Sequence, residues 1–562
     1  MSNDTSLGTT DRGILLDQLE RTSFDLLVIG GGITGAGVAR EAALRGLSVA
    51  LVEGRDFASG TSSRSSKLIH GGLRYLAMGD VNLVRETALE RKRVHKMAPH
   101  LAEPLWMLAP ARSRAQLMKF RTGITLYEKL GAVADPDRHR VWRGDELSEN
   151  EPLLDQQIYP YVCAYREYLT DDVRLVLANL RGASGLGACI ANHLAVDQIL
   201  HESDRVVGVH AKCGITNRTL AIRANAVVNA AGPWVEGVMA LDEGHSTQRL
   251  HLSKGIHIVV DRQRLPVRNL VIMSTEDRRS IFAIARGESV YIGTTDTSYP
   301  HAATVWPEIS EEDVEYLLAP LAKTFKADPV GPQDVISAWS GLRPLIAMAG
   351  KQAKEISRRD EIWTGASGLI TIAGGKLTGY RKMAASVVDR VVDVQGLPGA
   401  SSARAHVDEE DAPLPGGDFA GDLQKLADSV SRESGLTASC ADRLVRLYGA
   451  EAGAVASLGS DPVVAGGSVI GGEIGWAVDQ EAAATLEDVI YRRTRAALFN
   501  AHESGALLEP VSLRLQSRFG WSEEERVTQV EAVGDRLRHD LAFQRQLRTG
   551  ERSDAREETS SA

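Results

Sequence analysis

The stretch FDLLVIGGGITGAGVAREAALRGLSVALVE, residues 24–53, decides the fold of the first part of the chain. An apolar run leads into Gly30-x-Gly32-x-x-Gly35, a segment with helical spacing follows, and a second apolar run ends at Glu53. In this pattern the first glycine allows a tight turn, the second leaves room for a pyrophosphate, and the third lets the helix pack closely on the strand. We therefore predict a βαβ unit that binds a dinucleotide at the helix N-terminus, with the Glu53 carboxylate on ribose hydroxyls. The motif leaves open whether the dinucleotide is NAD or FAD.

The remaining sequence predicts a mixed body and a separate helical domain. Apolar, β-branched runs at 225–232, 256–260 and 289–296 predict further buried strands. Near the C-terminus, Ser522 and Glu525 form a capping-box pattern at the start of a helix. We expect an α/β plus α+β body, and then an all-α domain. The expected order is a polar N-terminal extension (1–23), the body (24–395), a Gly- and Pro-rich linker (396–418), the helical domain (419–545) and a disordered tail (546–562).

Composition excludes several classes of protein. The 562 residues carry 64 basic and 74 acidic side chains, and a net charge of -10 argues against a nucleic-acid binder. Four scattered cysteines without a CxxC motif fit a reducing cytoplasm, and the polar N-terminus does not resemble a signal peptide. No apolar run is long enough to cross a membrane, and no conspicuous basic amphipathic helix is visible, so any membrane contact is expected to be peripheral. No HExxH motif occurs and the histidines do not cluster at metal-ligand spacing, so no metal is expected.

A second group of motifs identifies a family. GTSSRSSKLIHGGLRYL (60–76) closely follows Glu53 and combines hydroxyls, charges and paired glycines. Further motifs follow in order: KMAPHLAEPL (96–105), DDVRLVLAN (171–179), NAAGPWV (229–235), KGIHIVV (254–260), IGTTD (292–296), SGLRPL (340–345), GGKLTGYRKMA (374–384) and RRTRAAL (492–498). This series resembles the FAD-dependent, aerobic and respiratory glycerol-3-phosphate dehydrogenases over roughly residues 24 to 540.

The resemblance implies a fold and an activity. The fold is a Rossmann-like FAD-binding domain interleaved with a β-sheet substrate domain, as in D-amino-acid oxidase, followed by a helical cap. The implied reaction is oxidation of sn-glycerol 3-phosphate to dihydroxyacetone phosphate, with hydride transfer from C2 to FAD and electrons passed to a membrane quinone. The family often forms homodimers, and its respiratory members bind the inner face of the cell membrane peripherally.

The resemblance also assigns residues. Arg343 and Arg358 are expected to bind the substrate phosphate and hydroxyl, although Arg359 leaves a one-residue ambiguity, and Arg74 and Tyr75 match positions beside the substrate. Lys376 is expected near flavin and substrate, and His257 is the first choice for the general base, with His70 as the second. A hydrogen-bonded core histidine is the alternative for His257. The expected cofactor-binding residues are Gly30, Gly32, Gly35, Glu53, Thr61, Ser62, Ser65, Ser66, Lys67, His70, Gly71, Gly72, Gly232, Gly375 and Lys376. Gly71 and Gly72 are expected to let the backbone pass close to the flavin.

Two other functions remain as alternatives. A glycerol-3-phosphate oxidase that reduces oxygen would carry nearly the same motifs, although a long insertion beside the cap would favour it and none is obvious. A flavin-binding sensor without catalysis would be favoured by loss of Arg343, Arg358 or Lys376, but all three are present.

Overall fold

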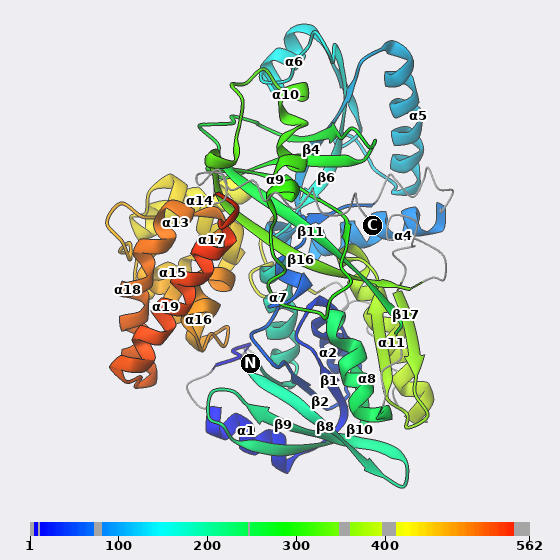
Figure 1. Ribbon diagram of the computed structural model, residues 1–562, viewed down its shortest axis with the longest axis vertical. Helices are drawn as coiled ribbons and strands as arrows, with labels where there is room; N and C mark the ends of the chain where they lie inside the picture. The colour runs from blue at the N-terminus through cyan, green and yellow to red at the C-terminus, as the bar shows by residue number, and fades with distance from the viewer. Residues whose placement is uncertain are drawn as a thin grey trace, which may run out of the picture.

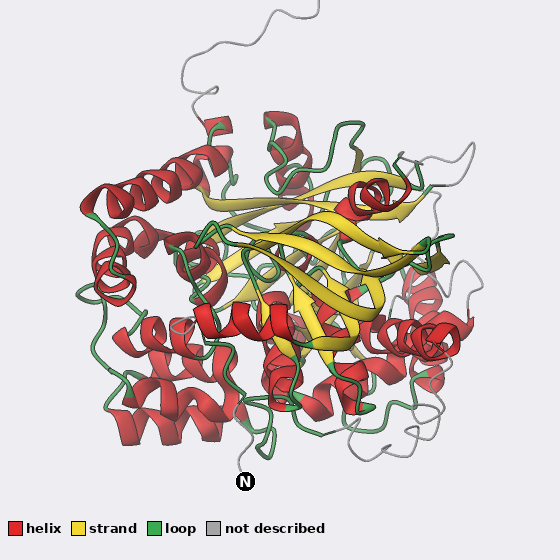
Figure 2. Cartoon of the chain, turned by 90° about the horizontal axis from the view of Figure 1, so that it is seen from below, coloured by secondary structure: helices red, strands yellow, loops and turns green. Residues whose placement is uncertain are grey.

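The computed structural model describes residues 5–8, 12–71, 81–244, 248–347, 360–395 and 412–544. Two β-sheets form the body, and the C-terminal helices lie beside it, coloured yellow to red in Figure 1. Figure 2 shows the strands in the interior with helices around them. The chain passes back and forth between the two sheets before it reaches the helical domain, which confirms the predicted interleaving.

The first sheet contains the predicted βαβ unit. β1 (Ser23–Ile29) pairs in parallel with β2 (Val49–Val52), and α2 (Ile33–Leu44) connects them. The strand order is β17-β18-β10-β1-β2-β7, and β9 pairs with β10 and β8. The further strands are β7 (Cys189–Ala191), β8 (Leu194–Glu202), β9 (Arg205–Cys213), β10 (Thr219–Asn229), β17 (Asp360–Thr364) and β18 (Ile370–Gly374).

Both faces of the first sheet are covered, which explains why β1 is apolar throughout. Leu26 and Val28 belong to a core shared with α2, α7 (Asp172–Gly185) and α11 (Tyr380–Gln395). Leu27 and Ile29 belong to a second core on the opposite face, shared with β8 and β9.

The N-terminal extension contributes to this second core. The first helix, α1 (Arg12–Arg21), buries Leu16 and Leu19 against the sheet. The expected polar N-terminal extension, residues 1–23, therefore contains a short amphipathic helix that packs on the body.

The second sheet of the body is mixed. Its order is β15-β11-β14-β13-β12-β4-β6-β3, with β16 on β11 and β5 on β6. Its strands are β3 (Leu68–Ile69), β4 (Glu103–Ala111), β5 (Arg140–Trp142), β6 (Tyr161–Leu169), β11 (Leu250–Asp261), β12 (Leu270–Ser274), β13 (Ser280–Arg286), β14 (Ser289–Gly293), β15 (Thr297–Ser298) and β16 (Val335–Ile346). The helices around the body include α4 (Val81–Met97), α5 (Arg114–Leu130), α6 (Gly144–Asn150), α8 (Val235–Glu243), α9 (Glu311–Leu318) and α10 (Leu321–Thr324). Within the described residues, no helix has the length and apolar character needed to span a membrane.

The C-terminal domain is helical, as predicted. Its helices are α13 (Leu423–Ser434), α14 (Ala438–Tyr448), α15 (Ala452–Ser457), α16 (Gly471–Asp479), α17 (Ala496–Phe499), α18 (Ala501–Phe519) and α19 (Glu523–Asp540), with a π-helical turn, η9 (Asp488–Arg493), before α17. The Ser522–Glu525 capping box is present at the start of α19. Of the expected linker, only residues 412–418 are described, and Leu414 is buried against the body. The expected tail, 546–562, lies outside the described residues.

The contact between α2 and the turn after β1 fixes the backbone at the N-terminus of α2, where the sequence predicts a dinucleotide site. Gly30 adopts φ +113°, a conformation that favours glycine, and a Cβ on Gly35 would lie 1.9 Å from the Gly30 carbonyl oxygen. We expect Gly35→Ala to destabilise the fold by about 1–3 kcal/mol, because backbone would have to shift. Thermal unfolding followed by circular dichroism would measure this as a lower Tm.

Gly505→Ala is the matched control, since Gly505 lies inside α18 and a Cβ there meets no atom within 4 Å. Alanine in a helix interior favours folding, so this variant should keep or raise the Tm. Equal Tm values for wild type and Gly35→Ala would contradict the assigned contact.

Candidate functional site

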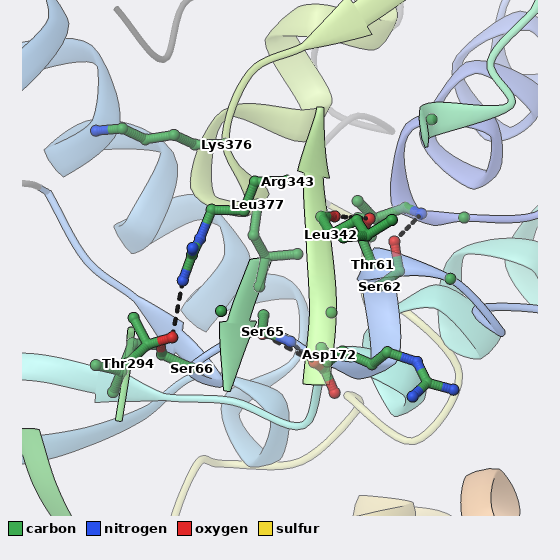
Figure 3. Close-up of a pocket in the computed structure, with 18 of the residues that line it drawn as sticks. Thr61, Ser62, Ser65, Ser66, Asp172, Thr294, Leu342, Arg343, Lys376 and Leu377 are labelled. Carbon is green, nitrogen blue, oxygen red and sulfur yellow. Dashed lines mark hydrogen bonds between the residues drawn. The ribbon is translucent and has the colours of Figure 1, made fainter. Parts of the chain in front are cut away.

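A cavity of about 2200 Å³ lies where the two sheets meet. Its wall is formed by the turn after β1, the segment after β2, the ends of β16 and β18, and residues of the helical domain. Figure 3 shows part of this wall, with the Arg343 side chain directed at Thr294, and Thr61 and Ser62 beside Leu342. The cavity is large enough for a dinucleotide and a small substrate together.

One end of the cavity has the features of a dinucleotide site. Gly30 and Gly32 line it at the N-terminus of α2, and the Ile33 N–H donates to Ser62 Oγ at 3.0 Å. The Glu53 carboxylate at the end of β2 accepts from the N–H groups of Gly31 (2.7 Å) and Arg55 (2.9 Å). Burial raises the pKa of Glu53, although these two hydrogen bonds oppose the rise. A carboxylate held at this place can accept hydrogen bonds from ribose hydroxyls, so the residues fit the adenosine half of FAD.

The other end of the cavity contains an arginine on the second sheet. Arg343 on β16 donates to Thr294 Oγ1 at 2.8 Å and lies 3.5 Å from the Asp296 carboxylate (Figure 3). The guanidinium crosses over Gly255 on β11, where a Cβ would lie 2.2 Å from an Arg343 nitrogen. Lys376, which follows β18, also lines the cavity. Two cationic side chains therefore line this cavity, and such groups attract anions.

The two candidate histidines differ in their access to the cavity. His70 lines it, and Thr378 Oγ1 both accepts from the His70 N–H and donates to its carbonyl oxygen. His257 is 1% exposed and stacks on Trp339, with ring centroids 4.8 Å apart. Its Nε2 lies 2.9 Å from the Oγ of Ser66, which does line the cavity. Burial lowers the pKa of His257 well below its usual range, and the charges of Arg343 and Lys67 lower it further.

Comparisons with known proteins identify the family. A family model described as FAD dependent oxidoreductase matches residues 25–381, and one described as the C-terminal domain of alpha-glycerophosphate oxidase matches residues 408–526. An aerobic glycerol-3-phosphate dehydrogenase of Bacillus subtilis is 36% identical over 547 residues, which cover 94% of this chain and 97% of that protein. The chain belongs to the aerobic glycerol-3-phosphate dehydrogenase family.

Two further relatives agree with this assignment. An aerobic glycerol-3-phosphate dehydrogenase of Staphylococcus haemolyticus is 38% identical over 514 residues, covering 89% of this chain and 91% of that protein. The X-ray structure of the Bacillus halodurans glycerol-3-phosphate dehydrogenase complexed with FAD has a TM-score of 0.77 and 34% identity, covering 96% of this chain and 99% of that one. The expected family, enzyme class, FAD cofactor and fold are thereby confirmed. The protein is an FAD-dependent oxidoreductase.

Most of the site residues expected for a member of this family meet at the cavity. Those that line it are Gly30, Gly32, Glu53, Thr61, Ser62, Ser65, Ser66, His70, Gly232, Arg343, Gly375 and Lys376. Gly72, Arg74, Tyr75 and Arg358 lie outside the described residues. Four others, Gly35, Lys67, Gly71 and His257, are described but do not line the cavity. Of these, Gly35 supports the turn from behind, and His257 stands behind Ser66.

Lys67 and Gly71 have structural partners instead of facing the cavity. The Lys67 ammonium is fully buried and pairs with Asp172 at 2.9 Å. The Gly71 N–H donates to the hydroxyl of Tyr127 at 3.1 Å, and a Cβ on Gly71 would lie 2.3 Å from that oxygen. The position therefore requires glycine because of Tyr127 on α5, a different reason from the expected close approach to the flavin.

Sequence reasoning missed two groups of residues at the site. Thr294 and Asp296, which belong to the motif IGTTD, hold the Arg343 guanidinium, although neither was among the expected site residues. The helical domain contributes cavity-lining residues, namely Thr485, Glu487, Asp488, Arg492, Gln529, Ala532 and Val533. The arginines of RRTRAAL could have indicated this contribution of the helical domain. An arginine pair in an apolar segment needs acidic partners, which other parts of the protein must supply.

One cluster resembles a metal site but is already neutralised. Ligand atoms of Asp56, His193 and Asp488 lie within 4.8 Å of one another. The side chains of Arg492 and Arg493 donate to Asp56, and those of Arg492 and His193 contact Asp488. A cation would have to displace these arginines, so the cluster is better described as an ion-pair network.

Proposed function

We propose that this protein oxidises sn-glycerol 3-phosphate to dihydroxyacetone phosphate and passes the electrons to a membrane quinone. In this reaction C2 loses a hydride and its hydroxyl loses a proton. In the last step the quinone is reduced to quinol. FAD, when bound, accepts the hydride. The observation that carries the proposal is Arg343, a largely buried cation in a cavity that also contains a dinucleotide-binding motif. The substrate is that of the aerobic glycerol-3-phosphate dehydrogenases to which the chain is similar.

Arg343 suits the phosphate of this substrate. A guanidinium matches phosphate oxygens bidentately, and Thr294 and Asp296 fix its direction through one hydrogen bond and one longer ionic contact. Asp296 is itself held, because Ser253 Oγ donates to its carboxylate. Lys376 adds a second positive charge that would stabilise the anionic reduced cofactor.

Access to the cavity favours His70 over His257 as the group that receives the hydroxyl proton. His70 faces the cavity directly, whereas His257 would act only through Ser66. In addition, the lowered pKa of His257 makes its ring a weak base, since a base whose pKa lies far below the working pH holds a proton poorly. We therefore propose His70 as the base and His257 as the residue that orients Ser66, which reverses the order expected from the sequence.

Helix α5 supports the proposed quinone and peripheral membrane contact. Met118 and Leu126 on this helix are 54% and 46% exposed, although most large apolar side chains of the body are buried. Arg114, Lys119, Arg121 and Lys129 are exposed on the same helix. This is the basic amphipathic helix that the sequence did not reveal. Lys119, Phe120 and Leu126 also line the cavity, so a lipid-soluble acceptor that reaches α5 reaches the wall of the site.

The decisive experiment is anaerobic mixing of the holoenzyme with sn-glycerol 3-phosphate while the flavin spectrum is recorded. We expect the oxidised flavin band to bleach, and to return when vesicles that contain a long-chain quinone are added. Sedimentation of the enzyme with anionic vesicles should accompany this reoxidation. No bleaching beside an active control enzyme would refute the substrate. Rapid reoxidation by oxygen with peroxide release, and none by the vesicles, would make the protein an oxidase.

Arg343→Ala should raise KM for sn-glycerol 3-phosphate by about 10²-fold or more, because a charge-assisted bidentate contact is worth about 3 kcal/mol. FAD should stay bound, since Arg343 contacts Thr294 and Asp296 beside the second sheet, whereas Glu53 contacts the Gly31 and Arg55 N–H groups beside the first. Steady-state kinetics and the flavin-to-protein absorbance ratio measure the two quantities.

Arg223→Ala is the control for loss of an arginine, since Arg223 is 58% exposed and pairs with an equally exposed Glu202. It should leave KM unchanged. If Arg343→Ala lost FAD together with substrate affinity, the assigned role in phosphate binding would be wrong.

The two histidines are separated by matched asparagine variants. His70→Asn should lower kcat by about 10²–10⁴-fold and remove the acid-side fall of the pH profile, because the proton acceptor is gone. His257→Asn should cost less than about tenfold, since Ser66 loses one hydrogen-bond partner only. Rapid-reaction flavin reduction between pH 5.5 and 9 would measure both, and the opposite ranking would identify His257 as the base.

A further inference from the structure

The segment that follows Glu53 forms much of the cavity wall. We call residues 54–67 the cofactor loop. Eleven of them line the cavity: Gly54, Arg55, Asp56, Ala58, Ser59, Gly60, Thr61, Ser62, Arg64, Ser65 and Ser66. Apart from one short 3-10 turn at Thr61–Ser63, the loop has no regular secondary structure. Its shape must therefore be fixed by contacts with other parts of the protein.

The first end of the loop is held by arginines of the helical domain. The carboxylate of Asp56, which is 1% exposed, accepts from both terminal nitrogens of Arg493 at 2.7 and 2.8 Å. It also accepts from Arg492 Nε, and from Asn192 Nδ2 at 3.0 Å. A buried carboxylate with bidentate arginine contact is fixed in both position and direction.

The second end of the loop is held through Asp172 at the start of α7. This fully buried carboxylate accepts from the N–H of Ser65 at 3.1 Å, from Ser65 Oγ at 2.8 Å and from the Lys67 ammonium at 2.9 Å. Arg495 of the helical domain also donates to this carboxylate, with one terminal nitrogen 3.2 Å from Asp172. Its Nε lies 3.1 Å from Asp171. The loop, the body and the helical domain therefore share one buried carboxylate.

The arginines at both ends come from a single short segment. Arg492 and Arg493 end the π-helical turn η9, and Arg495 follows two residues later with φ +61°. A non-glycine residue rarely adopts this conformation, and buried ion pairs can hold it there. Arg493 is fully buried and Arg495 is 2% exposed, and neither lines the cavity.

We propose that Arg493 and Arg495 are positioning residues for FAD: from the helical domain they hold both ends of the cofactor loop in the shape that binds the cofactor. Without either arginine, a buried aspartate keeps its charge and loses a partner, so the loop gains conformations that restore hydration. Only a fraction of the molecules would then have the loop conformation that binds FAD, and the apparent affinity for FAD would fall by that fraction. Linkage requires the reverse effect too, so bound FAD strengthens the docking of η9 on the loop. This proposal depends on FAD binding alone and not on the identity of the substrate.

The test compares release of FAD from holoenzyme variants. Arg493→Met and Arg495→Met should each raise the rate of FAD release on dilution by about tenfold or more, followed as recovery of free-flavin fluorescence. Arg181→Met is the matched control. Arg181 is a buried arginine of α7 that makes a bidentate pair with Glu451 of the helical domain at 2.6 and 2.8 Å, away from the cofactor loop. It should lower the Tm but leave FAD release within about twofold of wild type.

Two outcomes would overturn the proposal. FAD release at the wild-type rate in Arg493→Met and Arg495→Met would reduce these arginines to general stabilisers of the fold. Equal acceleration in all three variants would mean that any loosening of the helical domain releases FAD.

Two further measurements apply if the methionine variants do not fold. Arg493→Lys keeps the charge but loses the bidentate geometry, so it should release FAD at an intermediate rate. In wild type, hydrogen exchange of residues 488–495 should increase when FAD is removed. A wild-type rate in Arg493→Lys, or unchanged exchange on FAD removal, would contradict the coupling.

Discussion

The way in which the cofactor loop, the body and the helical domain fit together depends on the contacts of one buried carboxylate, that of Asp172. It lies at the first residue of α7, binds Ser65 and Lys67 of the cofactor loop, and accepts from Arg495 of the helical domain. Burial of so many charges is favourable only when each has close partners of opposite sign. The arrangement thus specifies how the parts fit together, because a displaced partner would leave a charge unpaired in the interior.

The net charge of the chain does not decide which ions its cavity can bind. The chain carries a net charge of -10, and the cavity is lined by acidic side chains as well as by cations such as Arg64, Arg343 and Lys376. Both FAD and the proposed phosphate substrate are anions, and a low-dielectric cavity strengthens their attraction to the few cations inside it. An acidic surface is therefore compatible with an anion-binding site. The basic face of α5 is a local exception on the outside.

Each of the two sheets positions a different set of residues at the site. The first sheet brings Gly30, Gly32 and Glu53 to the ends of adjacent parallel strands, where helix α2 presents its N-terminus. The second sheet brings Thr294 and Asp296, after β14, next to Arg343 on β16, and β11 pairs with both of these strands. The cofactor loop joins the two, since it begins directly after Glu53 and ends before β3 of the second sheet. Interleaving of the chain therefore places cofactor and substrate groups in one cavity.

The sequence by itself determined the features that depend on local spacing. The β1–α2–β2 unit, its three glycines and Glu53 lie within 30 residues, so their geometry follows from the order of residue types, and the capping box at Ser522 is equally local. Only the tertiary structure decided the partners that come from distant parts of the chain. It placed Lys67 on Asp172, Gly71 against Tyr127 and His257 behind Ser66, at separations of 105, 56 and 191 residues. The physical reason is that burial and ion pairing are set by what packs alongside a residue, and spacing along the chain does not encode that.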